Sequence, residues 1–247
     1  MRAGVAIRLV VLALLIAFVA SPQTFAFVFQ PLTRNGQPAI YLQNGLLNLT
    51  LSHLAIVAVA TVASTLVAVG LAIAVTRPFG AEFLPLSRTL ANVGQTFPPV
   101  AVLALAVPLL GFGTAPTLVA LFLYGLLPIF ENALTGLTTL PPAVTEAARG
   151  VGMTEGQRLV GVDLPLATPV ILAGIRLSVV ISIATATIGS TVAASTLGEV
   201  ILAGLLSSNL AFVAQGGLVV AVIAVLIYDG LSALERLLAH RTGQGAR

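Results

Sequence analysis

Long apolar runs separated by short polar stretches dominate the sequence. The runs with few or no formal charges are 9–33, 51–75, 89–130, 169–192 and 213–238. About 20 apolar residues cross a bilayer as one α-helix, and the run 89–130 is long enough for two crossings with a turn at "GFGTAP", residues 111–116. The pattern therefore predicts an all-α, polytopic membrane protein with about six transmembrane helices. We expect residues 195–212, which are shorter and more polar, to form a loop with a short helix at the membrane surface.

Composition supports a membrane protein and narrows its chemistry. Hydrophobic residues make up 58% of the chain and charged residues 8%, whereas about a quarter of residues are charged in a soluble domain. Cysteine is absent and the two histidines, His53 and His240, are far apart, so we expect no disulfide, catalytic site, metal site or cofactor in this chain. All 11 basic residues are arginine. Without lysine there is no Walker A motif, so any ATP must be bound by another subunit.

The arginines also predict the orientation of the chain, because basic residues in short loops stay in the cytoplasm. With cytoplasmic N- and C-termini, most arginines lie at the cytoplasmic side and only Arg34 lies outside; those at the cytoplasmic side are Arg2, Arg8, Arg77, Arg88, Arg149, Arg158, Arg236, Arg241 and Arg247. The first run could instead be a cleaved signal peptide. Phe18 fits the small-residue cleavage rule poorly, so we favour an uncleaved first span.

The loop at about 135–168, "EAARGVGMTEGQRLVGVDLP" at its centre, predicts two short helices. Prolines 141 and 142 suit a helix start, and an apolar stripe at helical spacing follows: Val144, Ala147, Ala148 and Val151. Gly150 and Gly152 can end this helix in a left-handed conformation. Thr154 and Gln157 have capping-box spacing and start a second helix, which Pro165 ends or bends. The stripe could fit a groove on a partner or pack under its own bundle, and its residues alone leave both possibilities open.

The same stretch resembles the EAA loop of binding-protein-dependent ABC importer permeases. That pattern is E-A-A, three residues, G, nine residues, I, one residue, L-P. It is matched by Glu146, Ala147, Ala148, Gly152, Leu164 and Pro165, with Val162 in the isoleucine position. The resemblance implies a type I ABC importer permease fold in a bacterial or archaeal cell membrane. It also implies that the loop, including Val144 and Val151, docks onto a cytoplasmic ATPase subunit.

Further segments resemble permeases that import glycine betaine, choline or related quaternary amines. These are "RPFGAEFLPL", "NVGQTFPPVAVLALAVPLLGFGTAP", "LFLYGLLPI" and "LPLATPVILAGIRLSVVISIATATIGS". The resemblance implies an external substrate-binding protein and a second permease, identical or similar, in the same bilayer, and no nucleic acid. We divide the chain into an N-terminal helix and external segment (1–45), a permease domain (46–238) and a cytoplasmic tail (239–247). Two alternatives stay open: a permease for another small solute such as methionine or another amino acid, and an ion-coupled secondary transporter.

Polar residues inside the predicted spans are candidates for a translocation path, because polarity is costly in lipid. Asn92, Gln95 and Thr96 precede consecutive prolines, which should unwind the third span; the alternative is a kink needed only for packing. Small residues recur every fourth position on the fifth span: Gly174, Ser178, Ser182, Ala186 and Ser190. This spacing favours close helix packing, with path lining by Ser178 and Ser182 as the second possibility.

Charges at membrane depth predict an ion pair. Arg176 and Asp229 lie at similar distances from the cytoplasmic ends of the fifth and sixth spans. We expect Arg176 to pair with Asp229, or with Glu131 at the end of the fourth span. A structural ion pair is favoured over a proton relay, because both acids have a candidate partner at their depth.

Overall fold

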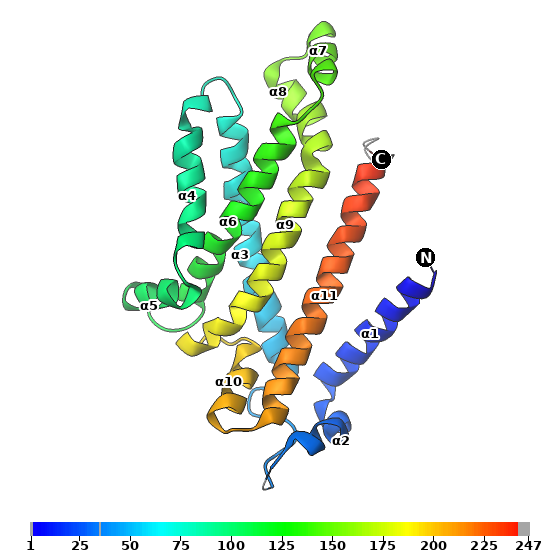
Figure 1. Cartoon of the computed structure of the whole chain (residues 1–247), viewed down its shortest axis with the longest axis vertical. Coiled ribbons are helices and arrows are strands. Elements are labelled where there is room, and N and C mark those ends of the chain that lie inside the picture. Colours follow the sequence, from blue (N-terminus) through cyan, green and yellow to red (C-terminus); the bar gives the residue numbers. More distant parts are fainter. Residues whose placement is uncertain (1, 35, 242–247) are drawn as a thin grey trace. The chain divides into compact units, whose positions relative to one another are not determined.

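A computed structural model describes residues 2–34 and 36–241, which form helices with no β-strand among them (Figure 1). Four helices are long and apolar enough to cross a membrane, and six spans result if each of two bent helix pairs counts as one. The all-α prediction with about six spans is confirmed. Arg247 and most of the predicted tail lie outside the described residues.

The chain folds as two compact units. The first unit comprises Met1–Val59, Pro98–Leu121 and Ser182–Tyr228, and the second comprises Ala60–Phe97, Phe122–Ile181 and Asp229–Arg247. Several long helices therefore contribute residues to both units. The predicted division at residues 45 and 238 stays a prediction.

In the first unit, the first apolar run is a bent helix pair. The helix α1 (Arg2–Ala20) is followed by η1 (Pro22–Phe25), α2 (Ala26–Phe29) and η2 (Gln30–Leu32), and the pair is bent by 111°. Proline disfavours a helical conformation in the residue before it, and Ser21 accordingly has φ −137° and ψ 64°. The first apolar run thus forms two helical parts that meet at Ser21, and together they can count as one span.

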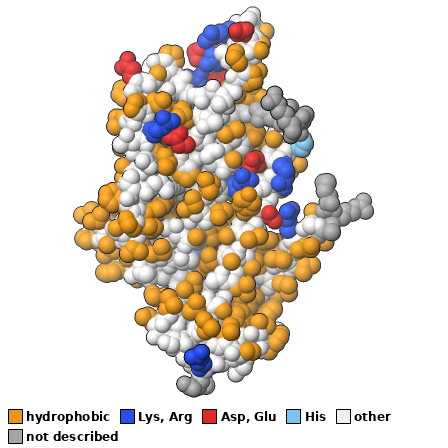
Figure 2. Space-filling model, in the orientation of Figure 1, with side chains coloured by type: hydrophobic (Ala, Val, Ile, Leu, Met, Phe, Trp, Pro, Cys, Tyr) orange, Lys and Arg blue, Asp and Glu red, His pale blue; other side chains and the backbone are white. Residues whose placement is uncertain are grey.

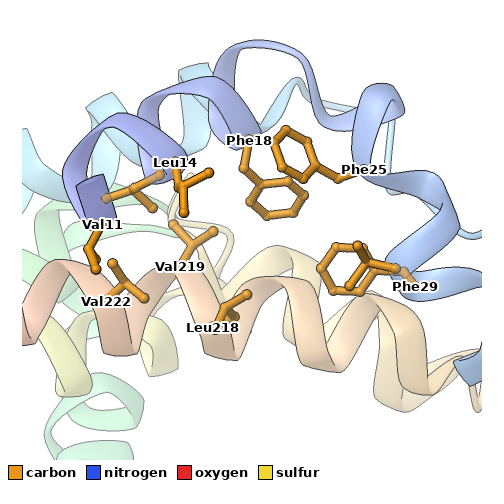
Figure 3. A pocket seen from close by; sticks show the side chains of 10 residues that line it. Val11, Leu14, Phe18, Phe25, Phe29, Leu218, Val219 and Val222 are labelled. Atoms are coloured by element: carbon orange, nitrogen blue, oxygen red, sulfur yellow. The ribbon is translucent and has the colours of Figure 1, made fainter. Parts of the chain in front are cut away.

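An apolar hollow lies between α1 and α11 (Leu210–Arg241), the helix that contains the predicted span 213–238. Figure 3 shows side chains of α1 facing side chains of α11 across this hollow, which has a volume of about 230 Å³. Phe18 stacks on Phe29 at its edge, with ring centroids 5.3 Å apart. The lining is entirely apolar: Val11, Leu14, Leu15, Phe18, Phe25, Val28, Phe29, Leu218, Val219 and Val222.

The short helix predicted within residues 195–212 is confirmed as α10 (Gly198–Leu206). It starts against the 3₁₀ helix η5 (Thr187–Val192). A Cβ atom on Gly198 would lie 1.8 Å from the carbonyl oxygen of Thr187, so only glycine permits this approach. Gln215 Nε2 donates to the Ala39 carbonyl, and Gln215 Oε1 accepts from the Tyr41 N–H. These hydrogen bonds connect the segment before α3 (Leu46–Val75) to α11.

The core of the second unit is built from small residues at helix crossings. The helix α4 (Leu84–Thr96) meets α6 (Thr114–Thr138) at Gly94, where a Cβ atom would lie 2.2 Å from the carbonyl oxygen of Leu123. Close approach through glycine and alanine is typical of membrane helices, because no hydrophobic effect drives them together in lipid. Larger buried side chains pack in the same unit, among them Leu126, Ile129, Phe130 and Leu134.

The helix predicted to unwind at consecutive prolines is interrupted there. α4 ends at Thr96 and α5 runs from Pro99 to Leu110, with Phe97 and Pro98 in extended conformations. Proline has no N–H to donate, so the helix cannot continue through both residues. The "GFGTAP" turn is also confirmed between α5 and α6, where Gly111 and Gly113 have φ values of +78° and +114°.

One expectation about Pro165 was wrong. It neither ends nor sharply bends the chain, because α9 (Leu164–Ala186) begins one residue earlier and a helical segment extends from Glu155 to Val192. The irregularity lies just before it, in the π-helical turn η4 (Leu159–Asp163), which closes with the Leu164 N–H donating to the Leu159 carbonyl. A wider π turn accommodates the missing donor and the bulk of the proline ring.

Candidate functional site: the loop between α6 and α9 and polar residues of the helices

The connection between α6 and α9 carries the predicted short helix, α7 (Pro142–Gly150). Pro142 occupies its first position, where the missing N–H costs nothing. A second short helix, α8 (Glu155–Arg158), follows. Figure 1 shows α7 and α8 together beyond the ends of α6 and α9. Both predicted helices are therefore confirmed.

The apolar stripe of α7 lines an open hollow of about 450 Å³. Ala148, at the base of the stripe, is 5% exposed, whereas Val151 is 76% and Met153 40% exposed. Figure 2 shows acidic and basic side chains gathered at the end that carries α7 and α8, with hydrophobic atoms beside them. Ala143, Met153 and Val162 join the four stripe residues as lining. Leu164 and Pro165 do not line the hollow but begin α9.

Gly152 makes the turn that ends α7. Its φ of +78° is in the left-handed region. Its N–H donates to the Arg149 carbonyl at 2.9 Å, and the Met153 N–H donates to the Ala148 carbonyl at 3.1 Å. This is the Schellman arrangement, in which glycine is preferred because it has no Cβ. The capping box of Thr154 and Gln157 is present with both of its hydrogen bonds, as predicted.

Four charged side chains, called here the ionic network, contact one another, three of them in the loop between α6 and α9 and one after α3: Glu155, Arg158, Asp163 and Arg77. Arg77 Nη2 lies 3.0 Å from Asp163 Oδ2, and Arg77 Nη1 lies 3.4 Å from Glu155 Oε2. Arg158 contacts the same two acids at 3.4 and 3.1 Å. Sequence reasoning missed this network because Arg77 precedes Asp163 by 86 residues. The one available signal was an acid directly before Leu164 and Pro165.

The polar candidates for a path fall into two groups. Asn92, Gln95 and Thr96 are exposed on α4, and Gln95 Nε2 donates to the Tyr124 carbonyl at 2.9 Å. Ser178 and Ser182 are buried on α9.

The small residues at every fourth position of α9, called here the small-residue stripe, include two that lie very close to α6. Ser178 Oγ lies 2.8 Å from the position of a Cβ on Gly125, and a Cβ on Gly174 would lie 2.7 Å from both Asn132 Cβ and the Pro128 carbonyl oxygen. These contacts support the favoured packing role of the stripe. Path lining stays a prediction for both polar groups.

Arg176 has a partner that the sequence reasoning did not name. Arg176 Nη1 lies 2.9 Å from Glu235 Oε2 and donates to Ser232 Oγ at 2.6 Å. Glu131 instead accepts two hydrogen bonds from Arg88, at 2.6 and 3.1 Å. Arg176 is thus part of an ion pair, while its predicted pairing with Asp229 stays a prediction.

Comparison with known proteins identifies the family. Residues 67–244 match the model of the binding-protein-dependent transport system inner membrane component. The chain belongs to this family. It is a membrane component of a transport system, and ATP hydrolysis in such a system lies in a separate subunit.

The sequence is similar to those of permeases named for the transport of osmoprotectants, choline and related solutes. It is 38% identical to the osmoprotectant import permease protein OsmY of Salmonella typhimurium over 81% of this chain and 85% of the relative. It is 37% identical to the choline transport system permease protein OpuBB of Bacillus subtilis, over 85% and 93%. The glycine betaine/carnitine/choline transport system permease protein OpuCB of Bacillus subtilis is 36% identical over 82% and 92%.

Solved structures share the permease's fold. An inward-facing MetNI methionine ABC transporter matches with a TM-score of 0.70 and 19% identity, over 78% of this chain and 95% of that one. An amino acid ABC transporter matches with a TM-score of 0.60. These likenesses confirm the ABC importer permease fold.

The permease also has a polar cluster in its first unit that sequence reasoning missed. Tyr41 Oη donates to Glu199 Oε1 at 2.6 Å, and Asn44 also donates to this carboxylate. Burial raises the pKa of the Tyr41 hydroxyl well above its usual range, and the hydrogen bond to Glu199 and its charge raise it further. Tyr41 therefore remains a donor at neutral pH. An open hollow beside the cluster is lined by Gln43, Asn44, Gly45, Asn48, Leu49, Ser52 and Ser195.

Proposed function

We propose that this permease imports quaternary-amine osmoprotectants, such as glycine betaine or choline, with energy from ATP bound by a separate subunit. The observation that carries the proposal is the 36–38% identity, over more than 80% of the chain, to permeases named for osmoprotectant, choline and glycine betaine/carnitine/choline transport. The match extends through the spans rather than only the loop between α6 and α9, called here the docking loop.

The docking loop is the proposed contact with the ATPase. Val144, Ala147, Ala148 and Val151 would seat in an apolar groove of that subunit, with the exposed Glu146 beside them. Burial of exposed side chains such as Val151 would supply the binding free energy. Gly152 makes the turn that presents the stripe, and Leu164 and Pro165 begin the helix that would receive the movement.

Substrate capture is assigned to an external binding protein. Quaternary ammonium groups are bound by aromatic cages through cation–π attraction, and this chain has no tryptophan and three tyrosines. The permease would then provide a weakly binding path, for which Asn92, Gln95, Thr96, Ser178 and Ser182 are the candidates.

The transport cycle proposed is alternating access by two permease subunits, identical or similar, with N- and C-termini in the cytoplasm. ATP-driven closure of two ATPase subunits would move the docking loops and open the path to the outside. Reopening of the inner side would then release the solute.

The substrate assignment is tested by reconstitution. The permease is incorporated into vesicles with its ATPase and binding protein, and uptake of radiolabelled glycine betaine, choline, carnitine and methionine is measured. We expect ATP-dependent uptake of at least one quaternary amine and none of methionine. Uptake of methionine alone would reassign the substrate. Uptake by the permease without an ATPase would identify a secondary transporter instead.

The substitution Gly152→Val tests the docking loop. A β-branched residue is strained at a φ of +78°, so the stripe should no longer be presented correctly. We expect normal membrane insertion, a loss of uptake of about tenfold or more, and ATP hydrolysis that no longer responds to the binding protein. Gly156→Ala is a suitable control, because Gly156 is exposed and its Cβ would meet nothing within 4 Å. Unchanged uptake in Gly152→Val would count against docking by α7.

A further inference from the structure

The ionic network joins the docking loop to the C-terminal end of α3. Glu155 and Arg158 belong to α8, and Asp163 ends the π turn η4, so three members lie on the elements that directly follow α7. Arg77 is the member outside the loop, two residues after the end of α3. The network carries two positive and two negative charges, which balance.

The backbone holds Arg77 firmly against α3. Its N–H donates to the Ala74 carbonyl at 3.3 Å, and its own carbonyl accepts from the Gly80 N–H at 3.0 Å. A Cβ on Gly80 would lie 2.1 Å from the Ala74 carbonyl oxygen, so this turn closes back onto the helix end. Thr76 Oγ1 adds a hydrogen bond to the Ala72 carbonyl at 2.9 Å. The backbone of Arg77 is therefore fixed to the C-terminal end of α3.

The opposite end of the network is fixed to α9. Asp163 directly precedes Leu164, the first residue of α9, and occupies the one position between Val162 and Leu164 that the EAA pattern leaves open. The π turn of residues 159–163 sets its direction, and π turns are frequent at functional sites. Asp163 is 5% exposed and Arg77 8% exposed, so their contact is shielded from solvent.

The composition of the network argues against a purely stabilising role. Desolvation of two buried charges offsets most of their attraction, so a buried ion pair is weak evidence for stability. In addition, Arg77 Nε is buried and has no hydrogen-bond partner within the described part of the chain, and a buried unsatisfied donor is destabilising. A well-packed apolar contact would hold the loop as well. What charges add is a directional connection that is specific to one geometry.

We propose that the ionic network transmits movement of the docking loop to α3, and that Arg77 is the positioning residue that makes α3 and α8 move together. The proposal rests on the proposed docking of α7 to an ATPase. Without Arg77, α9 would still follow the loop through the chain itself, whereas α3 would lose its charged contact with it.

Transport stoichiometry tests this role in the complete complex of permease, ATPase and binding protein in vesicles. We expect Arg77→Gln to retain the ATPase through purification but to lower solute imported per ATP hydrolysed by about fivefold or more. Glu155→Gln leaves the buried pair intact and should lower the ratio less. The matched control is Arg88→Gln, which removes an exposed ion pair of the same unit and should leave the ratio unchanged.

A distance measurement tests the joint movement directly. The chain has no cysteine, so spin labels can be attached at Phe79→Cys, 78% exposed beside Arg77, and at Gly156→Cys on α8. We expect the distance between labels to stay the same in nucleotide-free and ATP-trapped complexes, and to change between these states when Arg77→Gln is added. Arg88→Gln should preserve the constant distance.

The outcomes separate this inference from the proposed function. A wild-type complex that fails to bind an ATPase or to import solute with ATP overturns the proposed function itself. If the wild-type complex works, but Arg77→Gln and Glu155→Gln leave both the stoichiometry and the label distance unchanged, the network does not transmit movement. If Arg77→Gln loses the ATPase while Glu155→Gln has a normal ratio, the network only shapes the docking surface, and the proposal is also wrong.

Discussion

Three arginine–carboxylate pairs in the second unit rank in opposite orders by distance and by burial. Arg88–Glu131 is the shortest, at 2.6 Å, and has side chains 52% and 37% exposed. Arg176–Glu235 is intermediate, at 2.9 Å with 22% and 26% exposure. Arg77–Asp163 is the longest, at 3.0 Å, and its side chains are only 9% and 6% exposed.

The comparison indicates that burial, more than the distance between the charged atoms, determines how much an ion pair contributes to stability. In an exposed pair, solvent screens each charge and can replace the lost partner. In a buried pair, removal of one member leaves a charge that solvent cannot reach and that more distant neighbours compensate only in part. We therefore expect the effects of substitution to follow burial and to run against distance.

The largest effect is expected for Asp163→Asn. It leaves the buried guanidinium of Arg77 with only Glu155 at 3.4 Å. The free energy of unfolding in detergent micelles should fall by about 3–5 kcal/mol, as measured by denaturant titration. A loss no greater than that of Arg88→Gln would break the ranking by burial.

An intermediate effect is expected for Arg176→Ala. Glu235 is partly exposed, so some solvent can reach the carboxylate that remains. The free energy of unfolding should fall by about 1.5–3 kcal/mol, and uptake should fall with the amount of assembled complex. Normal assembly and normal transport would show that the Arg176 ion pair has no structural role.

The smallest effect is expected for Arg88→Gln. Its midpoint of unfolding should match that of the wild type at every salt concentration above about 0.15 M NaCl, because exposed charges are screened there. A loss comparable to that of Asp163→Asn would mean that a partner, such as the second permease subunit, covers this surface in the assembled protein. The same titration in the assembled complex would then sharpen the comparison.

Local rules were sufficient to predict the two short helices between α6 and α9. The start of α7 at Pro142, the turn at Gly152 that follows α7 and the capping box of Thr154 all depend on residues within a few positions of each other. Hydrogen bonds of this kind form between near neighbours, so a sequence pattern contains all of their parts. The same holds for the interruption at Pro98 and Pro99, which follows from the missing N–H of proline.

Expectations failed or stayed open where the outcome depends on distant contacts or on the accommodation of strain. Pro165 was expected to end or bend a helix, but a π turn lies directly before it and the helical segment continues through Pro165. Glu131 was a candidate partner for Arg176 by depth alone, yet the structure joins it to Arg88. Depth along a span gives one coordinate of a side chain, whereas pairing also depends on which helix faces which.

The sequence by itself predicted an α-helical membrane permease with two short helices in the loop that resembles the EAA pattern, because apolar length, turn residues and motif spacing are properties of neighbouring residues. Only the tertiary structure decided that Arg77 closes onto Asp163, a residue 86 positions away. Such a contact depends on how whole helices pack, and packing in the second unit is set by small residues such as Gly94 and Gly174 that permit close approach.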